Sequence, residues 1–273
     1  MMQKVQGTIL DEIISARLRR LEEIEARVPV SQLMRQVASR RDFRSFRSAL
    51  STPGVRVIAE MKKASPSAGL LRSDYECREI AKAYQSAGAV ALSVLTEEDY
   101  FQGALNHLAE ARSATALPVL RKDFILSEYQ VYEAAAAGAD AVLLIVAVLS
   151  ENELRGLIAL AEQLRIAPLV EVHTAQEVER ALAAGAHNLG VNNRNLLTME
   201  VDLSASLRLR EKIPAHCRTV SESGIRSAAD VKTLIDAGFD AMLVGESLMR
   251  TPDPGAALRA MIEGAREILD TAE

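Results

Sequence analysis

The sequence contains no tryptophan and only two cysteines, Cys77 and Cys217, which lie in unrelated contexts. A disulfide framework and a Cys-x-x-Cys metal site are therefore excluded, and a reducing compartment is expected. The formal net charge is −5 and no basic run is longer than Arg40-Arg41, so we expect no nucleic-acid partner. A chain with these features is expected to be a globular protein rather than a nucleic-acid-binding or disulfide-rich one.

Long apolar segments are also missing. The longest strictly apolar run, residues 141–149, has nine residues, against roughly 20 needed to cross a bilayer. The first 13 residues lack the apolar core of a signal peptide. We therefore expect a cytoplasmic protein with no membrane partner. Hydrophobic residues make up 49% of the chain and charged residues 25%, which is enough apolar sequence for a sizeable core.

Several catalytic motifs are absent as well. The four histidines are dispersed without HxxxH or HExxH spacing, so no metal site is expected. A GxSxG nucleophile elbow is missing, which argues against a hydrolase of that kind. Neither GxGxxG nor a P-loop occurs, which disfavours a doubly wound nucleotide-binding sheet.

Two different patterns divide the chain. Apolar residues recur at helical spacing in the first 50 residues, and a second short helix is expected after Ser31 as a candidate N-cap. Beyond Pro53-Gly54, short runs rich in Val, Ile and Leu alternate with longer helical stretches, as in parallel strands buried on both faces. The eight expected strands are 55–61, 90–95, 118–123, 139–146, 167–172, 187–191, 217–223 and 240–245.

A small repeat supports this reading. Gly88, Gly138, Gly185 and Gly238 each follow an alanine and stand just before an expected strand. Each fits the position after a helix end, where a positive φ is wanted. Eight such helix–strand units predict an α/β fold, a (β/α)8 TIM barrel, with a doubly wound sheet as the alternative. We expect one domain over 1–273, with an N-terminal helical extension at 1–52 and the barrel at 53–273.

Charged residues occur at the ends of several expected strands, where a (β/α)8 enzyme has its active site. Glu60 and Lys62 are two positions apart and so face the same side. If strand parity also turns Lys122, Glu171 and Glu222 inward, two ammonium groups and three carboxylates share one mouth and must compensate one another. The alternative is an ion-pair network that only seals the barrel. Crowded acids and bases have displaced pKa values, which favours a catalytic role.

A phosphate site is expected beside these charges. In such barrels it often lies in the loops after the seventh and eighth strands. Ser223-Gly224 and Gly245-Glu246 occupy those positions, and glycine lets backbone N–H groups approach an anion. Tyr100-Phe101, after the second strand, could stack on a planar ligand or plug the core.

Seven segments carry a family resemblance. They occur in order at successive strand ends: EMKKASPSAG, SVLTEEDYFQG, LRKDFI, LVEVH, LGVNNRNL, SESGI and LVGESLM. Together they resemble the indole-3-glycerol-phosphate synthase family of the tryptophan pathway, over nearly the whole chain. The resemblance implies a carbon–carbon lyase that converts 1-(2-carboxyphenylamino)-1-deoxyribulose 5-phosphate to indole-3-glycerol phosphate, without a cofactor or metal. The family often has a basic residue at the position of Ala68, which leaves details of that loop open.

The resemblance also implies roles. Lys122 matches the general acid at the carbonyl oxygen, and Glu171 matches the carboxylate that serves dehydration, with Glu60 and Lys62 beside it. Asn192 and Glu222 match positions that orient the substrate and the lysines. The family's phosphate and loop positions are matched by Ser65, Ser223, Gly224, Gly245 and Glu246. Arg194 also lies in a matched motif, and its role stays open. Partner enzymes of the pathway cannot be named from the sequence.

Two other functions compete with this one. A sugar-phosphate isomerase of the same pathway would want a cysteine base near the end of the first strand, where this chain has Glu60 and Lys62. A non-catalytic ligand-binding barrel would be expected to lose one of the acid or base positions, and none is lost. The lyase is therefore the favoured prediction.

Overall fold

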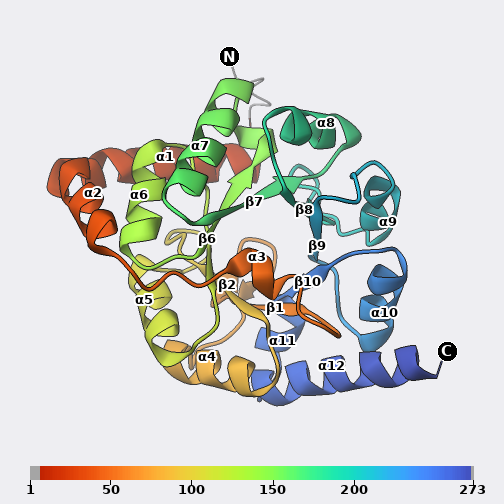
Figure 1. The fold of residues 1–273 in the computed structure, drawn as a ribbon. Helices are drawn as coiled ribbons and strands as arrows, with labels where there is room; N and C mark the ends of the chain where they lie inside the picture. Colours follow the sequence, from red (N-terminus) through yellow and green to blue (C-terminus); the bar gives the residue numbers. More distant parts are fainter. Residues whose placement is uncertain (1–6, 272–273) are drawn as a thin grey trace.

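In the computed structural model, residues 7–271 are described, and they contain a closed barrel of eight parallel strands (Figure 1). Around the barrel the strand order is β1-β10-β9-β8-β7-β6-β5-β4. This confirms the predicted (β/α)8 class and each of the eight expected strands. Their bounds are β1 Val57–Met61, β4 Ala91–Leu95, β5 Val119–Lys122, β6 Ala141–Ile145, β7 Ala167–Val172, β8 Asn188–Asn192, β9 Arg218–Glu222 and β10 Ala241–Val244.

Helices surround the barrel and account for the apolar strand runs. Strands β1, β4, β6 and β8 are buried at every position, because their outer faces pack on helices and their inner faces fill the barrel. The outer helices are α4 Cys77–Ser86, α5 Leu105–Ala114, α6 Glu128–Ala136, α7 Glu151–Gln163, α8 Ala175–Ala183, α9 Ser204–Arg210, α10 Ala228–Asp236 and α12 Pro254–Asp270, with the short η1 Val146–Val148 and α11 Glu246–Met249.

The repeated glycines occupy the helix–strand turns, as predicted. Gly88, Gly138, Gly185 and Gly238 have φ of +96°, +96°, +92° and +86°. Glycine reaches this left-handed region without strain, so each helix can end abruptly and the chain can re-enter the barrel. The repeat is thus the local signal that sets the spacing of the βα units.

Three helices precede the barrel, and one of them lies beside its mouth. They are α1 Ile9–Arg27, α2 Val30–Ser39 and α3 Phe46–Ala49. Helix α1 starts with a capping box between Thr8 and Asp11. The expected N-cap at Ser31 is wrong, because α2 already begins at Val30 with Pro29 as its N-cap. The division at 52/53 stays a prediction, and its outermost residues, 1–6 and 272–273, lie outside the described part.

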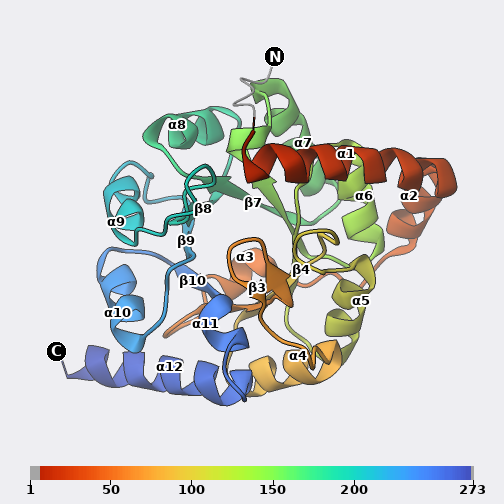
Figure 2. The same ribbon diagram turned by 180° about the vertical axis from the view of Figure 1, so that it is seen from behind.

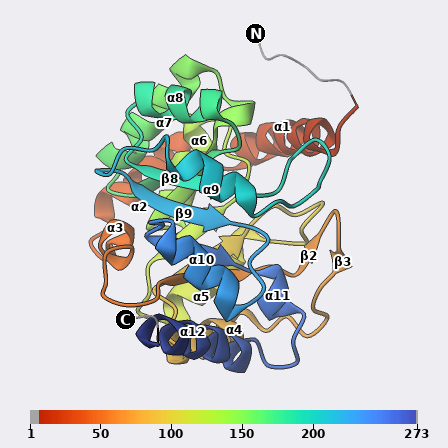
Figure 3. The same cartoon turned by 90° about the vertical axis from the view of Figure 1, so that its right-hand side faces the viewer.

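The two ends of the barrel differ. Helix α1 and a small hairpin, β2 Ala64–Ser65 with β3 Gly69–Leu70, lie at the end to which the strands point, while α3 lies at the opposite end (Figures 2 and 3). The sequence pattern did not predict this hairpin, since its strands have two residues each. Within residues 7–271, no helix is both long and apolar enough to cross a membrane.

Candidate active site

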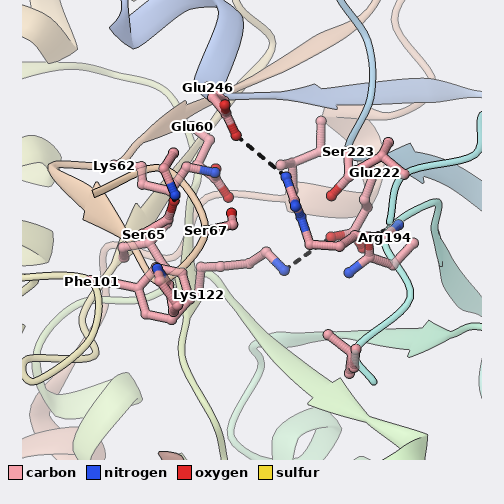
Figure 4. A pocket seen from close by; sticks show the side chains of 18 of the residues that line it. Glu60, Lys62, Ser65, Ser67, Phe101, Lys122, Arg194, Glu222, Ser223 and Glu246 are labelled. Atoms are coloured by element: carbon pink, nitrogen blue, oxygen red, sulfur yellow. Dashed lines mark hydrogen bonds and ion pairs between the residues drawn. The ribbon is translucent and has the colours of Figure 1, made fainter. Parts of the chain in front are cut away.

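A cavity of about 700 Å³ opens at the carboxyl ends of the strands. All twelve residues singled out from the sequence line it: Glu60, Lys62, Ser65, Lys122, Glu171, Asn192, Arg194, Glu222, Ser223, Gly224, Gly245 and Glu246. They come from the carboxyl ends of six barrel strands, β1, β5, β7, β8, β9 and β10, and from the segments that follow them. The side chains of Glu60, Lys62, Lys122, Arg194 and Glu222 point toward one space (Figure 4).

The Lys122 ammonium lies at the bottom of the cavity between two carboxylates. Its Nζ is 2.9 Å from Glu171 Oε2 and 3.1 Å from Glu222 Oε2. Burial by itself would lower the pKa of Lys122, but Glu171, Glu222 and Glu60 outweigh that effect and raise it. Lys122 is therefore held as a cation, with protons to donate toward the cavity.

The two carboxylates beside Lys122 differ in their hydrogen bonding. Glu171 accepts hydrogen bonds from Lys122 and, at 3.1 Å, from Asn192 Nδ2. Burial opposes its ionisation, but these donors and the nearby His173 lower the pKa of Glu171. Glu222 meets Lys122 only in the ion pair at Oε2, and neither of its oxygens accepts a well-aligned hydrogen bond among the described residues. Burial, together with the charge of Glu171, raises the pKa of Glu222 to about 7 despite Lys122.

The second lysine forms its own pair at the rim. Lys62 Nζ is 2.7 Å from Glu60 Oε2, which confirms that these two residues face the same side of β1. The space for this pair comes from the neighbouring strand, because a Cβ added to Gly245 would overlap the Glu60 carboxylate. Gly190 on β8 does the same for Glu222, whose Oε1 a Cβ there would overlap. Two glycines thus make room for two buried acids.

Asn192 and Arg194 carry the network from β8 to the rim. Besides its bond to Glu171, Asn192 uses Oδ1 to accept the Arg194 backbone N–H at 3.0 Å. The Arg194 guanidinium is fixed by the Met199 carbonyl at 3.0 Å and by Glu246 Oε2 at 3.3 Å. Its remaining donors are available to an anion in the cavity.

The predicted phosphate corner is made of tight backbone turns. Ser223 and Gly224 have φ of +67° and +81°, so two successive residues are left-handed. A left-handed serine is strained, and such strain is often found at functional sites. After the next strand, β10, Gly245 leads into α11, where the Glu246 carboxylate forms ion pairs with Arg194 and Arg250. Glu246 is therefore suited to hold the arginines, and a phosphate would be bound by backbone and hydroxyl groups.

One wall of the cavity is apolar. Phe101 and Phe124 face each other there with ring centroids 6.3 Å apart. Leu95, Leu143 and Ile145 continue this surface. The adjacent pair Tyr100-Phe101 was expected either to stack on a planar ligand or to plug the core. Phe101 lines the cavity, whereas Tyr100 packs against the core. The sequence pattern draws attention to Phe124 only within the LRKDFI segment and does not single out Leu143 or Ile145, because apolar residues at strand ends also look like core.

No group of three or more His, Cys, Asp or Glu side chains within residues 7–271 is arranged to hold a metal ion. The chemistry that these residues can perform is proton transfer and electrostatic stabilisation, through two ammonium groups and three carboxylates. The fold and the site together define a (β/α)8 enzyme that acts by acid and base catalysis on a small phosphorylated substrate.

Comparison with known proteins makes the assignment specific. The family described as indole-3-glycerol phosphate synthase matches residues 10–261, and the chain belongs to this family. A relative of that name from Lactiplantibacillus plantarum is 44% identical, over 94% of this chain and 99% of its own. Another, from Acidithiobacillus ferrooxidans, is 49% identical over 92% of this chain and 97% of its own.

Solved structures agree on the fold alone. Thiamine phosphate pyrophosphorylase from Pyrococcus furiosus superposes with a TM-score of 0.60 at 18% identity, over 82% of this chain and all of its own. Orotidine 5′-phosphate decarboxylase from Pyrococcus horikoshii gives 0.59 at 13% identity, over 77% of this chain and 99% of its own. At such low sequence identities, these comparisons show only that the barrel architecture is shared.

Proposed function

We propose that the cavity converts 1-(2-carboxyphenylamino)-1-deoxyribulose 5-phosphate into indole-3-glycerol phosphate, carbon dioxide and water, a step of tryptophan biosynthesis. Family membership supports the reaction, and the observation that carries it is the Lys122 ammonium between Glu171 and Glu222. Ring closure places negative charge on a carbonyl oxygen, and a buried cation beside that oxygen is what the step requires.

Lys122 is the general acid in this proposal. As the aryl carbon that bears the carboxylate attacks the ketone, Lys122 gives a proton to the ketone oxygen. Its neighbours Glu171 and Glu222 keep it charged until then, which is the state a proton donor needs. Loss of CO₂ restores the aromatic ring and consumes no further proton.

Dehydration then needs an acid for the departing hydroxyl and a base for a carbon-bound proton. Glu171, held ionised by Lys122 and Asn192, is suited to be the base. The Glu60–Lys62 pair lies across the same cavity and can assist the hydroxyl's departure. Asn192 and Glu222 orient these groups.

The two ends of the substrate fit opposite parts of the cavity. Its aromatic ring matches the wall of Phe101 and Phe124, since apolar contacts there bind a planar ring without polar cost. Its phosphate matches the corner of Ser223, Gly224 and Gly245, with Ser65 on the loop opposite. The net charge of −5 supports the absence of a nucleic-acid partner. The two free cysteines, Cys77 and Cys217, fit a reducing compartment and so support a cytoplasmic protein.

The direct test is to incubate the purified protein with the carboxyphenylamino-deoxyribulose phosphate and follow indole fluorescence. We expect a signal that depends on enzyme concentration and is lost with Lys122→Met. A folded wild-type protein that gives no signal would overturn the proposal. Turnover of a phosphorylated sugar isomer without release of CO₂ would favour the isomerase instead.

A further inference from the structure

His173 contacts the catalytic carboxylate from the side away from Lys122. It follows β7, and its side chain is 12% exposed. Ring nitrogen Nδ1 is 3.3 Å from Glu177 Oε2 on α8 and is hydrogen-bonded to it. Nε2 is 3.4 Å from Glu171 Oε1, which is within ion-pair distance but is not aligned as a hydrogen bond. The His173 backbone N–H also donates to Glu177 Oε2 at 2.7 Å. A neutral imidazole carries one N–H and can donate to only one of these acids, whereas an imidazolium can donate to both.

A second cavity, of about 830 Å³, lies behind this histidine. His173 and Glu177 line the second cavity, and Glu171 lines the first. Exposed residues of the β8–α9 loop, including Asn195 and Glu200, line it as well, so it communicates with solvent. The two cavities adjoin, since Leu10, Asn192 and Leu196 line both, and the imidazole stands between the reaction centre and the second, solvent-connected space.

The proposed reaction creates a need for such a connection. The ketone oxygen leaves as water and so takes up two protons, while one carbon-bound proton is released. The carboxylate leaves as CO₂ without a proton. Each turnover therefore consumes one proton, and the mouth through which solvent would supply it is occupied by the substrate.

We propose that His173 is a proton-relay residue, which passes a proton from the second cavity to Glu171 and thence to Lys122; this inference rests on the proposed function. The Nε2–H of the imidazolium gives its proton to Glu171 Oε1. Glu171 Oε2, 2.9 Å from Lys122 Nζ, restores the ammonium that protonated the substrate. The carbon-bound proton that Glu171 accepts in dehydration passes by way of Lys122 to the departing hydroxyl, so the relay has to supply only the one proton given to the ketone oxygen. A proton from solvent in the second cavity, taken up beside Glu177, then restores the imidazolium, so protons balance over the cycle.

The charges around His173 favour its cationic form. Burial opposes the charge, but Glu177, Glu171 and, more weakly, Glu222 prevail and raise the pKa of His173. Lys122 acts on His173 only through Glu171, which lies between the two residues. The remaining charged groups lining the second cavity are Asp11, Glu151, Arg180, Glu200, Asp202 and Arg208. Acids outnumber bases in this set, which favours proton entry.

The test compares His173→Gln and His173→Ala with a control variant, His187→Gln. His187 stands just before β8, at the amino end of the barrel strands, so this change leaves the acids of the site untouched. Glutamine can still donate a hydrogen bond, but its amide does not take up or release a proton in the pH range of an enzyme assay. We expect kcat of both His173 variants to fall about tenfold, below the ~10²-fold typical of a direct general acid, with KM unchanged. Added imidazole should restore kcat of His173→Ala, and Glu177→Gln should shift the pH profile of kcat.

Three outcomes would overturn the relay. The first is a His173→Gln enzyme with wild-type kcat at all pH values. The second is a loss in both His173 variants that neither imidazole nor buffer concentration changes, since this would indicate a structural role. The third is an equal loss in His187→Gln. An inactive wild-type enzyme would instead contradict the proposed function, so the two failures are distinguishable.

Discussion

Two neighbouring residues of β5 are buried cations with opposite surroundings. Arg121 points outward toward the helices, where each of its side-chain nitrogens is hydrogen-bonded, to Thr96, Asp123, Glu133 or the Gln130 carbonyl. Lys122 points into the barrel. Around Arg121, two arginines face two carboxylates, since Arg17 of α1 also pairs with Asp123 at 2.7 Å. Around Lys122, two lysines face three carboxylates.

This difference separates a structural network from a reactive one. The Arg121 cluster is balanced in charge, and Asp123 accepts bonds from Arg17, Thr96, Arg121 and the Phe124 N–H. The Lys122 cluster has an excess acid, and Glu222 accepts no well-aligned hydrogen bond in the described structure. Arg17 Nε has no hydrogen-bond partner among the described residues, so the contrast lies in the acids. Acids that are fully hydrogen-bonded resist proton movement, whereas crowded acids that lack such donors have pKa values that are pushed apart.

The largest expected effect is on catalysis by Lys122→Met. Because this change removes the proposed general acid, kcat should fall by about 10²- to 10⁴-fold while KM changes little. Steady-state kinetics measure both parameters. Lys63→Met is the matched control, since Lys63 follows Lys62 just after the end of β1 and forms none of the ion pairs found among residues 7–271. A rise in KM alone would make Lys122 a binding residue.

Arg121→Met should have the converse effect. Removing this cation leaves Glu133 buried without an ion-pair partner and Asp123 paired with Arg17 alone, so the free energy of unfolding should fall by about 3–5 kcal/mol. Urea unfolding measures this loss, with the exposed Arg155→Met as control, expected within about 0.5 kcal/mol of wild type. A stability loss greater for Lys122→Met than for Arg121→Met would contradict the distinction between the two clusters.

The acids of the Lys122 cluster should show opposite pH dependences of stability. The folded pKa of Glu222 is about 7, above its ordinary 4.5, so the stability it contributes is full below pH 4.5 and lost as the pH rises toward 7. This loss is about 3 kcal/mol. The pKa of Glu171 is lowered, so its contribution is present above pH 4.5 and lost as the pH falls below that value.

Unfolding free energies of Glu222→Gln and Glu171→Gln, each relative to wild type between about pH 2.5 and pH 7.5, measure these two contributions. We expect the two difference curves to have slopes of opposite sign, in different pH ranges. Curves that are parallel, or flat for Glu222→Gln, would mean that the two carboxylates have equivalent surroundings.

The smallest expected effect concerns the space that Gly190 leaves for Glu222. Alanine there would displace the Glu222 carboxylate, so we expect a stability loss of about 1–3 kcal/mol and a changed pH profile of kcat. Gly156→Ala on α7 is the control, because its Cβ would meet no atom within 4 Å. That helical change should stabilise the protein by about 0.5–1 kcal/mol with kcat unchanged. Equal tolerance of both alanines would show that Glu222 is not confined by Gly190.

The sequence predicted the mouth residues because strand parity and strand ends are local properties. Glu60 and Lys62 follow from a spacing of two, and the barrel follows from apolar runs and helix-ending glycines. The surroundings of Glu222 could not be predicted in this way. They depend on Gly190 of β8, and so on how neighbouring strands are aligned. The position of His173 behind Glu171 likewise depends on α8 and on a cavity formed by distant loops.

Single-turnover CO₂ release is the most direct test of whether the Lys122 cluster is the centre of the decarboxylating ring closure. Enzyme in excess over the carboxyphenylamino-deoxyribulose phosphate is mixed and quenched, and CO₂ and indole product are measured together. Wild type should release CO₂ and form the indole in equal amounts. Lys122→Met should bind the substrate with little change in affinity and release neither at a comparable rate. Release of CO₂ by Lys122→Met at the wild-type rate would contradict the assignment of the reaction centre.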